Sequence, residues 1–422
     1  MKRRILTVVL AMLGVLTLSA CGKGGEGTKT ADGKVPLRVA IWKQNDEEFY
    51  REIEKRFEEK YDNIDVQLEI NGDESSYNTN LQADMMDGSI ADVFDLHANT
   101  TMASYAKTGL LASQQDMAYM ANYDESAKSV STMYGENYGF INAYSYFGFI
   151  YNIDIFNELG IKVPTTPEEL VTAVKTLQDA GYGGIAYPGL TNGNAIFTAA
   201  FVSAIGSDNF KNFYEGIDNG TIKDISTENG IVDVLKTIQM YTQEDIWYNA
   251  FDAMSYEPSL SLFATEKTAI AYVGTYIFGE KDLYFPNVNA GYFPIPTYAA
   301  NGVSYAEGGQ CTCIRSDTEY LEEAKLWVEF LASPEISEYY CSNAKVFSTI
   351  TDVEPEFDTA EMIMSSSTGY ALSPVLMTEN TEWWSHEWSL MIEGILWEGK
   401  DYKALMEDLN AQLVEADIAN RQ

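Results

Sequence analysis

The stretch LRVAIWKQNDEEFYREIEKRFEEKYDNIDVQLEI, residues 37–70, decides the fold of this chain. Apolar and polar side chains alternate over 37–41 and again over 64–70, which is the period-two pattern of a half-buried strand. Between them, apolar residues recur every four positions from Phe49 to Phe57, and this spacing predicts a helix that Asn45 caps. A strand, a helix and a strand at this spacing form a βαβ unit with parallel strands. The sequence therefore predicts an α/β fold that begins with this unit.

The same alternation of strand and helix patterns continues downstream. Thr166-Pro167-Glu168-Glu169 is a capping box with proline at the first helical position, so a helix is expected to begin there. Short strands are expected at 92–96, 184–187 and 268–273, and helices at 170–177, 231–238, 321–331 and 405–413. No fixed-period repeat interrupts this alternation.

The first 34 residues are expected to be a targeting region rather than part of the fold. Basic residues 2–4 precede a twelve-residue apolar run at 5–16, which fits a signal peptide and is short for a membrane span. Leu18-Ser19-Ala20-Cys21 resembles the lipobox of bacterial lipoproteins, and this resemblance implies a signal peptide over 1–20 and a lipid on Cys21. The glycine-rich run that follows predicts a flexible tether over 21–34.

The charge balance excludes one class of partner. The chain has 422 residues, with 63 acidic and 27 basic residues and a net charge of −36. Such a field repels phosphate, so nucleic acid is not expected as a partner. The acidity fits a solvated surface, and attraction for a cationic ligand is the alternative interpretation.

The remaining cysteines and the histidines predict neither a disulfide framework nor a metal site. Cys311 and Cys313 lie two residues apart in a strand-like run and Cys341 is distant, so we expect three buried free thiols. His97 and His386 are the only histidines, and neither has a metal-ligand spacing. No cofactor and no metal are therefore expected.

Several motifs, taken in order, carry a resemblance that covers nearly the whole chain after the tether. A tryptophan follows the first strand, and the further motifs are 88–93 (GSIADV), 149–170 (FIYNIDIFNELGIKVPTTPEEL), 263–276, 293–296 (FPIP) and 308–309 (GG). In this order they resemble extracellular solute-binding proteins of the maltose-binding type, the lipoprotein components of ABC sugar importers.

The resemblance implies a fold of two α/β lobes around a central ligand cleft, with hinge crossings near 144–147, 298–303 and 347–353. The first lobe would comprise 35–145 plus 301–350, and the second lobe 146–300 plus 351–422. Such proteins close on their ligand by hinge motion.

The resemblance also implies where a ligand binds, because open α/β sheets bind ligands beyond the carboxyl ends of their strands. The candidates are Trp42, Gln44, Asp46, Asp95, His97 and Asn99 in the first lobe, Tyr144 at the hinge, and Tyr187, Tyr276, Trp383 and Trp384 in the second lobe. Glu307 joins Asp46 and Asp95 as a candidate if the ligand is a cation. Packing in the core is the competing interpretation for Trp42 and Tyr187, and Trp383 and Trp384 cannot both face one way from an extended segment.

The expected function is capture of a carbohydrate, most simply an oligosaccharide, by a monomer anchored to the outer face of the cell membrane, and its delivery to the permease subunits of an ABC importer. The alternatives are a binding protein for a cationic solute such as a polyamine, a secreted glycoside hydrolase, and an adhesive lipoprotein. A hydrolase would need two carboxylates close together, and the sequence contains none of the common hydrolase or nucleotide motifs that would specify another chemistry.

Overall fold

A computed structural model describes residues 29–72, 74–227, 230–373 and 384–420 of the chain. The predicted signal peptide, the lipid attachment at Cys21 and Trp383 lie outside the described residues. Among the helices that are described, none combines the length and the apolar character of a membrane span.

The first lobe is built on a five-stranded sheet with the strand order β2-β1-β3-β11-β6. The strands are β1 (Val35–Ile41), β2 (Ile64–Ile70), β3 (Val93–Leu96), β11 (Cys311–Ile314) and β6 (Phe140–Ile141). β1 runs parallel to β2 and to β3, whereas β11 runs antiparallel to β3 and β6. The parallel pair that the opening stretch predicts is confirmed.

Helix α1 (Glu47–Lys60) connects β1 to β2 and buries Tyr50, Ile53 and Phe57. Asp46, one residue later than predicted, stands at the N-cap position and makes no side-chain capping hydrogen bond. The prediction that Asn45 caps this helix is therefore wrong. The Asn45 amide instead donates to the Glu280 carboxylate, at 3.0 Å.

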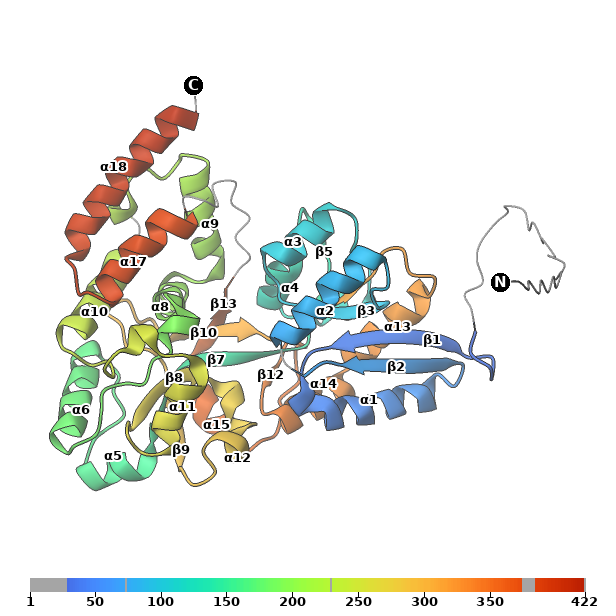
Figure 1. The fold of residues 1–422 in the computed structure, drawn as a ribbon, viewed down its shortest axis with the longest axis horizontal. Helices are drawn as coiled ribbons and strands as arrows, with labels where there is room; N and C mark the ends of the chain where they lie inside the picture. The colour runs from blue at the N-terminus through green and yellow to red at the C-terminus, as the bar shows by residue number, and fades with distance from the viewer. Residues whose placement is uncertain (1–28, 73, 228–229, 374–383, 421–422) are drawn as a thin grey trace, which may run out of the picture.

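The second sheet is organised around one long strand, β7 (Ala143–Asn152), which lies between the two lobes (Figure 1). Its first half pairs with the strands that cross between the lobes, and its second half pairs with strands of the second lobe. The partners are β10 (Val303–Gly308) and β12 (Phe347–Ser348) for the first half, and β8 (Ile270–Gly274) and β9 (Ala290–Phe293) for the second; β13 (Gly369–Leu372) pairs with β10. Each predicted hinge crossing thus lies in or next to one of these strands.

Helix α6 (Pro167–Asp179) of the second lobe begins at the predicted capping box. The Thr166 hydroxyl accepts a hydrogen bond from the Glu169 backbone N–H, and the Glu169 carboxylate accepts one from the Thr166 N–H. The strand expected at 184–187 forms only isolated bridges, in which Ile185 pairs with Trp247 and Ala186 with Ala271.

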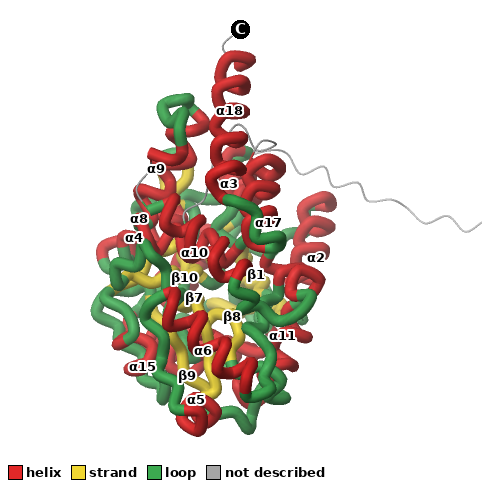
Figure 2. Tube along the Cα trace, turned by 90° about the vertical axis from the view of Figure 1, so that its left-hand side faces the viewer, coloured by secondary structure: helices red, strands yellow, loops and turns green. Residues whose placement is uncertain are grey.

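Helices cover the sheets on their outer sides, so the strands lie inside the molecule (Figure 2). The first lobe carries, besides α1, the helices α2 (Glu74–Asp87), α3 (Thr100–Lys107), α4 (Glu125–Ser131), α13 (Leu321–Leu331) and α14 (Pro334–Ala344). The second lobe carries, besides α6, the helices α5 (Ile153–Leu159), α7 (Gly189–Asn192), α8 (Ala195–Ile205), α9 (Ser207–Asp218), α10 (Ile231–Gln243), α11 (Tyr256–Ala264), α12 (Lys281–Tyr284), α15 (Ala360–Ser365), α17 (Ser389–Leu396) and α18 (Tyr402–Asn420).

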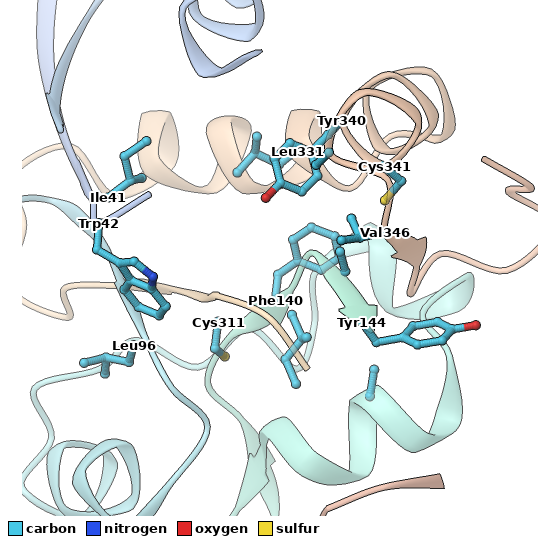
Figure 3. Packing of buried hydrophobic residues seen from close by; sticks show 14 of the residues in the cluster. Ile41, Trp42, Leu96, Phe140, Tyr144, Cys311, Leu331, Tyr340, Cys341 and Val346 are labelled. Atoms are coloured by element: carbon cyan, nitrogen blue, oxygen red, sulfur yellow. The ribbon is translucent and has the colours of Figure 1, made fainter. Parts of the chain in front are cut away.

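Two apolar cores stabilise these layers. The first surrounds the five-stranded sheet and continues through the crossing strands to α11 and α12, and the second fills the space among α8, α10 and α17. Figure 3 shows Trp42 and Cys311 within the first core. Cys311, Cys313 and Cys341 are all buried and free, as predicted.

Candidate ligand-binding site

Two rings meet at the carboxyl ends of adjacent parallel strands. Trp42 follows β1 and His97 follows β3, and their ring centroids lie 4.7 Å apart with an interplanar angle of 40°. Trp42 is only 8% exposed, because its ring also packs 5.5 Å from the ring of Tyr77. The two candidates are thus brought together, and Trp42 has an additional role in the core.

A buried carboxyl group lies close to these rings. Asp95 on β3 is 1% exposed; its Oδ1 accepts a hydrogen bond from the Thr312 hydroxyl at 2.9 Å, and its Oδ2 has no partner among the described residues. Burial raises the pKa of Asp95 to about 7, while the Thr312 hydrogen bond and the charges of Lys43 and His97 act in the opposite direction. Asp95 therefore has one buried carboxyl oxygen without a hydrogen-bond partner among the described residues.

A second carboxyl group comes from a crossing strand. Glu307 on β10 faces Ser145 of β7 in the sheet register and accepts a hydrogen bond from the Tyr305 hydroxyl at 2.7 Å. Burial raises the pKa of Glu307, and the charge of His97 opposes that shift. His97 is therefore within electrostatic reach of both Asp95 and Glu307.

Asp46 is already occupied by protein partners. Its Oδ2 accepts a hydrogen bond from the Tyr340 hydroxyl at 2.7 Å and lies 3.5 Å from the Lys43 ammonium nitrogen. These contacts fix the segment after Trp42 to helix α14. Gln44 lies in the same segment, and its side chain is outside the described residues.

Tyr276 is the candidate residue that the second lobe contributes near Glu307. It lies on the 3₁₀ turn Thr275–Phe278 directly after β8, is partly buried, and donates its hydroxyl proton to the Tyr256 hydroxyl at 2.8 Å. Burial raises its pKa, and the negative charges of Glu280 and Glu307 add to this shift. Tyr276 of the second lobe is therefore within electrostatic reach of Glu307 on the crossing strand, and Glu307 is within electrostatic reach of His97 in the first lobe.

Three other candidates have structural partners in this conformation. Tyr187 is fully buried, and its hydroxyl donates to the Gly193 carbonyl at 2.8 Å and accepts from the Ile196 N–H at 3.2 Å. Asn99 caps helix α3 by accepting from the N–H groups of Thr101 and Met102. Tyr144 stacks on Tyr370 at 4.0 Å and 19°.

Trp384 begins the π-helical turn Trp384–Trp388, and its side chain, like the whole of Trp383, lies outside the described residues. Both therefore stay predictions. Across the part of the chain that is described, no cluster of three or more His, Cys, Asp or Glu side chains is arranged to hold a metal ion.

Sequence reasoning missed two residues of this region, Tyr256 and Tyr305. Tyr305 stands two positions before Glu307 on one strand, so the alternation of side chains could have placed both on the same face. Tyr256 opens a helix far along the chain from Tyr276, and the sequence contains no local signal that pairs their hydroxyls.

Comparisons with known proteins agree with this architecture. The sequence model of the bacterial extracellular solute-binding protein family matches residues 42–338. The chain is 23% identical to the multiple sugar-binding protein of Streptococcus mutans serotype c over 79% of each chain. It is 22% identical to the melibiose/raffinose/stachyose-binding protein MelE of Bacillus subtilis over 83% of this chain and 82% of that one.

Among solved structures, the fold is similar to that of the ligand-free RafE from Streptococcus pneumoniae, with a TM-score of 0.70, 19% identity, and coverage of 91% of this chain and 98% of that one. That likeness shows the two-lobe fold. Because the family match extends over more than half of the sequence, the chain belongs to the bacterial extracellular solute-binding protein family and acts outside the cytoplasm.

Proposed function

We propose that this protein captures an oligosaccharide between its two lobes and delivers it to the membrane subunits of an ABC importer. The observation that carries the proposal is the set formed by Trp42, Asp95, His97, Glu307 and Tyr276, to which both lobes and a crossing strand contribute. The sugar-binding names of the relatives support the same substrate class.

The chemistry of this set suits a sugar. A sugar ring has apolar C–H faces and a rim of hydroxyl groups, so it needs a flat aromatic surface and hydrogen-bond partners at once. Tyr276 offers an aromatic ring, and Asp95 Oδ2 and the Glu307 carboxylate offer acceptors for hydroxyl groups. A ligand that contacts both lobes stabilises the closed arrangement.

A cationic solute is the second candidate, because the same set contains two carboxyl groups. Among the described residues, Lys43 and His97 supply the positive charge that acts on Asp95, and His97 supplies that on Glu307; Lys43 is already paired with Asp46. A polyamine would supply the missing positive charge. Catalysis is not part of the proposal, since the family and the relatives are binding proteins.

The proposal includes attachment to the membrane. The lipobox-like sequence at 18–21 supports lipid on Cys21, with the tether to residue 34 between the lipid and the first strand. The protein then works as a monomer at the outer face of the cell membrane, beside the importer to which it releases its ligand.

A thermal-shift screen over oligosaccharides and polyamines tests the function. A ligand at a hundredfold excess over its Kd adds about 2.7 kcal/mol to the free energy of unfolding, which is a readily measured shift. Stabilisation by an oligosaccharide supports the proposal. Stabilisation by spermidine alone assigns the second candidate, and no response to either class contradicts both.

A further inference from the structure

We propose that Gly279 and Glu280 of the second lobe, pressed against Asn45 and Ala344 of the first, form an interlobe contact that sets how closely the lobes approach. The contact lies between η5 (Thr275–Phe278) and α12 on one side and the start of α1 and the end of α14 on the other (Figure 1). Its effect on ligand affinity rests on the proposed function. Its effect on the angle between the lobes does not.

The polar half of the contact is a hydrogen bond between residues far apart in sequence. The Asn45 side-chain amide donates to Glu280 Oε1 at 3.0 Å, at an exposed position. Asn45 precedes α1, and Glu280 stands at the N-cap position of α12. The Glu280 carboxylate makes no capping hydrogen bond to its own helix. It instead accepts the hydrogen bond from Asn45 of the first lobe.

The steric half of the contact requires a glycine. A Cβ atom on Gly279 would lie 2.5 Å from the backbone oxygen of Ala344 at the end of α14. Gly279 has φ −69° and ψ −29°, which any residue adopts. The absence of a side chain therefore serves the close approach to Ala344 and not the local backbone.

This contact is connected to the ligand-binding segment. Helix α14, which ends at Ala344, also carries Tyr340, whose hydroxyl donates to Asp46 at 2.7 Å. Asp46 lies in the segment that begins with Trp42. A change in the distance between Gly279 and Ala344 therefore acts on the helix to which Asp46, four residues after Trp42, is hydrogen-bonded.

The steric half is tested by Gly279→Ala, with Gly369→Ala as the matched control. The Cβ of Gly369 would meet nothing within 4 Å, so the control adds the same methyl group in open space. Cysteines introduced at Met86 on α2 and Leu390 on α17, which are 90% and 51% exposed, carry spin labels for a distance measurement in the ligand-free protein. All proteins carry Cys21→Ala, and the native Cys311, Cys313 and Cys341 are fully buried and do not compete for the label.

We expect Gly279→Ala to change the distance between the labels and Gly369→Ala to leave it as in the wild type. If the fraction of binding-competent protein falls to about a fifth, the apparent Kd rises about fivefold. An unchanged distance in a Gly279→Ala protein that folds normally overturns the proposal. If no sugar binds to the wild type, the proposed function fails while the distance measurement still decides this inference.

The polar half is tested by exchanging donor and acceptor, which also covers the case in which Gly279→Ala does not fold. Asn45→Asp places two carboxylates opposite each other, so we expect a changed distance that relaxes toward the wild-type value in high salt. Adding Glu280→Gln restores an amide–carboxylate hydrogen bond with isosteric side chains, and we expect the wild-type distance to return. A double variant that behaves like Asn45→Asp alone overturns the role of this hydrogen bond.

Discussion

The ring centroid of His97 lies 4.7 Å from that of Trp42, although the two residues follow different strands of the first sheet. The two rings pack against each other. Asp95, on β3, lies two residues before His97 and interacts with it electrostatically. The candidate site in the first lobe is therefore a packed unit that a ligand meets already formed.

Tyr276→Ala is expected to weaken oligosaccharide binding by at least tenfold, or about 1.4 kcal/mol. The substitution removes the aromatic ring that the second lobe contributes. Tyr276→Phe keeps that ring and removes only the hydrogen bond to Tyr256, so its effect should be smaller. Calorimetric titration measures both. Unchanged affinity in the alanine variant would remove Tyr276 from the site, and a comparable loss of stability without ligand would make it a core residue.

Tyr187→Phe is expected to destabilise the protein without changing its affinity for ligand. The hydroxyl of Tyr187 is buried and bonded to Gly193 and Ile196, so its removal leaves a carbonyl and an N–H without this partner, at a cost on the order of 1–3 kcal/mol. Urea denaturation gives the stability and titration gives the affinity. A large loss of affinity at unchanged stability would restore Tyr187 as a ligand-binding residue.

Asp95→Asn is expected to flatten the pH dependence of stability. Burial raises the pKa of Asp95 from 3.8 to about 7, so between these values the folded protein keeps a proton that the unfolded chain has lost. The stability due to this group is complete below about pH 4 and is lost as the pH rises to about 7. Asparagine has no such proton and can still accept the hydrogen bond from Thr312.

Denaturation of the wild type and of Asp95→Asn at about pH 5 and about pH 8 provides the measurement. The variant should gain stability relative to the wild type at the higher pH. Equal pH slopes in the two proteins would mean that Asp95 titrates in its ordinary range.

Cys21→Ala is expected to release the protein into the medium or the soluble fraction. The substitution removes the thiol that takes the lipid, and the described residues contain no helix that could replace the anchor. Fractionation of cells followed by immunoblotting measures the distribution. Retention of the variant on membranes washed with high salt would refute lipid attachment at Cys21.

Ligand binding is expected to decrease the radius of gyration, because a ligand that contacts both lobes favours the closed arrangement. Small-angle scattering with and without saturating sugar measures the change, and a sugar that gives no thermal shift is the control. Identical curves at saturation would argue against closure.

The sequence predicts those parts of the fold that local patterns determine. The βαβ unit of 37–70 and the capping box at Thr166 depend on side chains a few positions apart, and the structure confirms both. Tyr187 and Tyr276 are harder to distinguish, because both follow apolar runs. Tyr187 is buried by Trp247 and Tyr272, whose rings lie 5.5 and 5.2 Å away, and no local pattern shows such distant contacts.

Two asparagines have roles in the structure that differ from those predicted from the sequence. Asn99 directly precedes α3, and asparagine is a preferred N-cap residue, although the resemblance implied that it binds the ligand. Asn45 was expected to cap α1, and its contact with Glu280, across 235 positions of the chain, could not be read from sequence.

The position of β11 has a consequence for how the protein is made. This strand, at 311–314, pairs with both β3 and β6 within the first sheet, so the sheet remains incomplete until most of the chain has been synthesised. Pairing over such a separation is slow, because loop closure precedes any gain from contacts. A chain that cannot complete its first lobe early stays unfolded for longer. An unfolded chain is the form that can pass through a secretion channel.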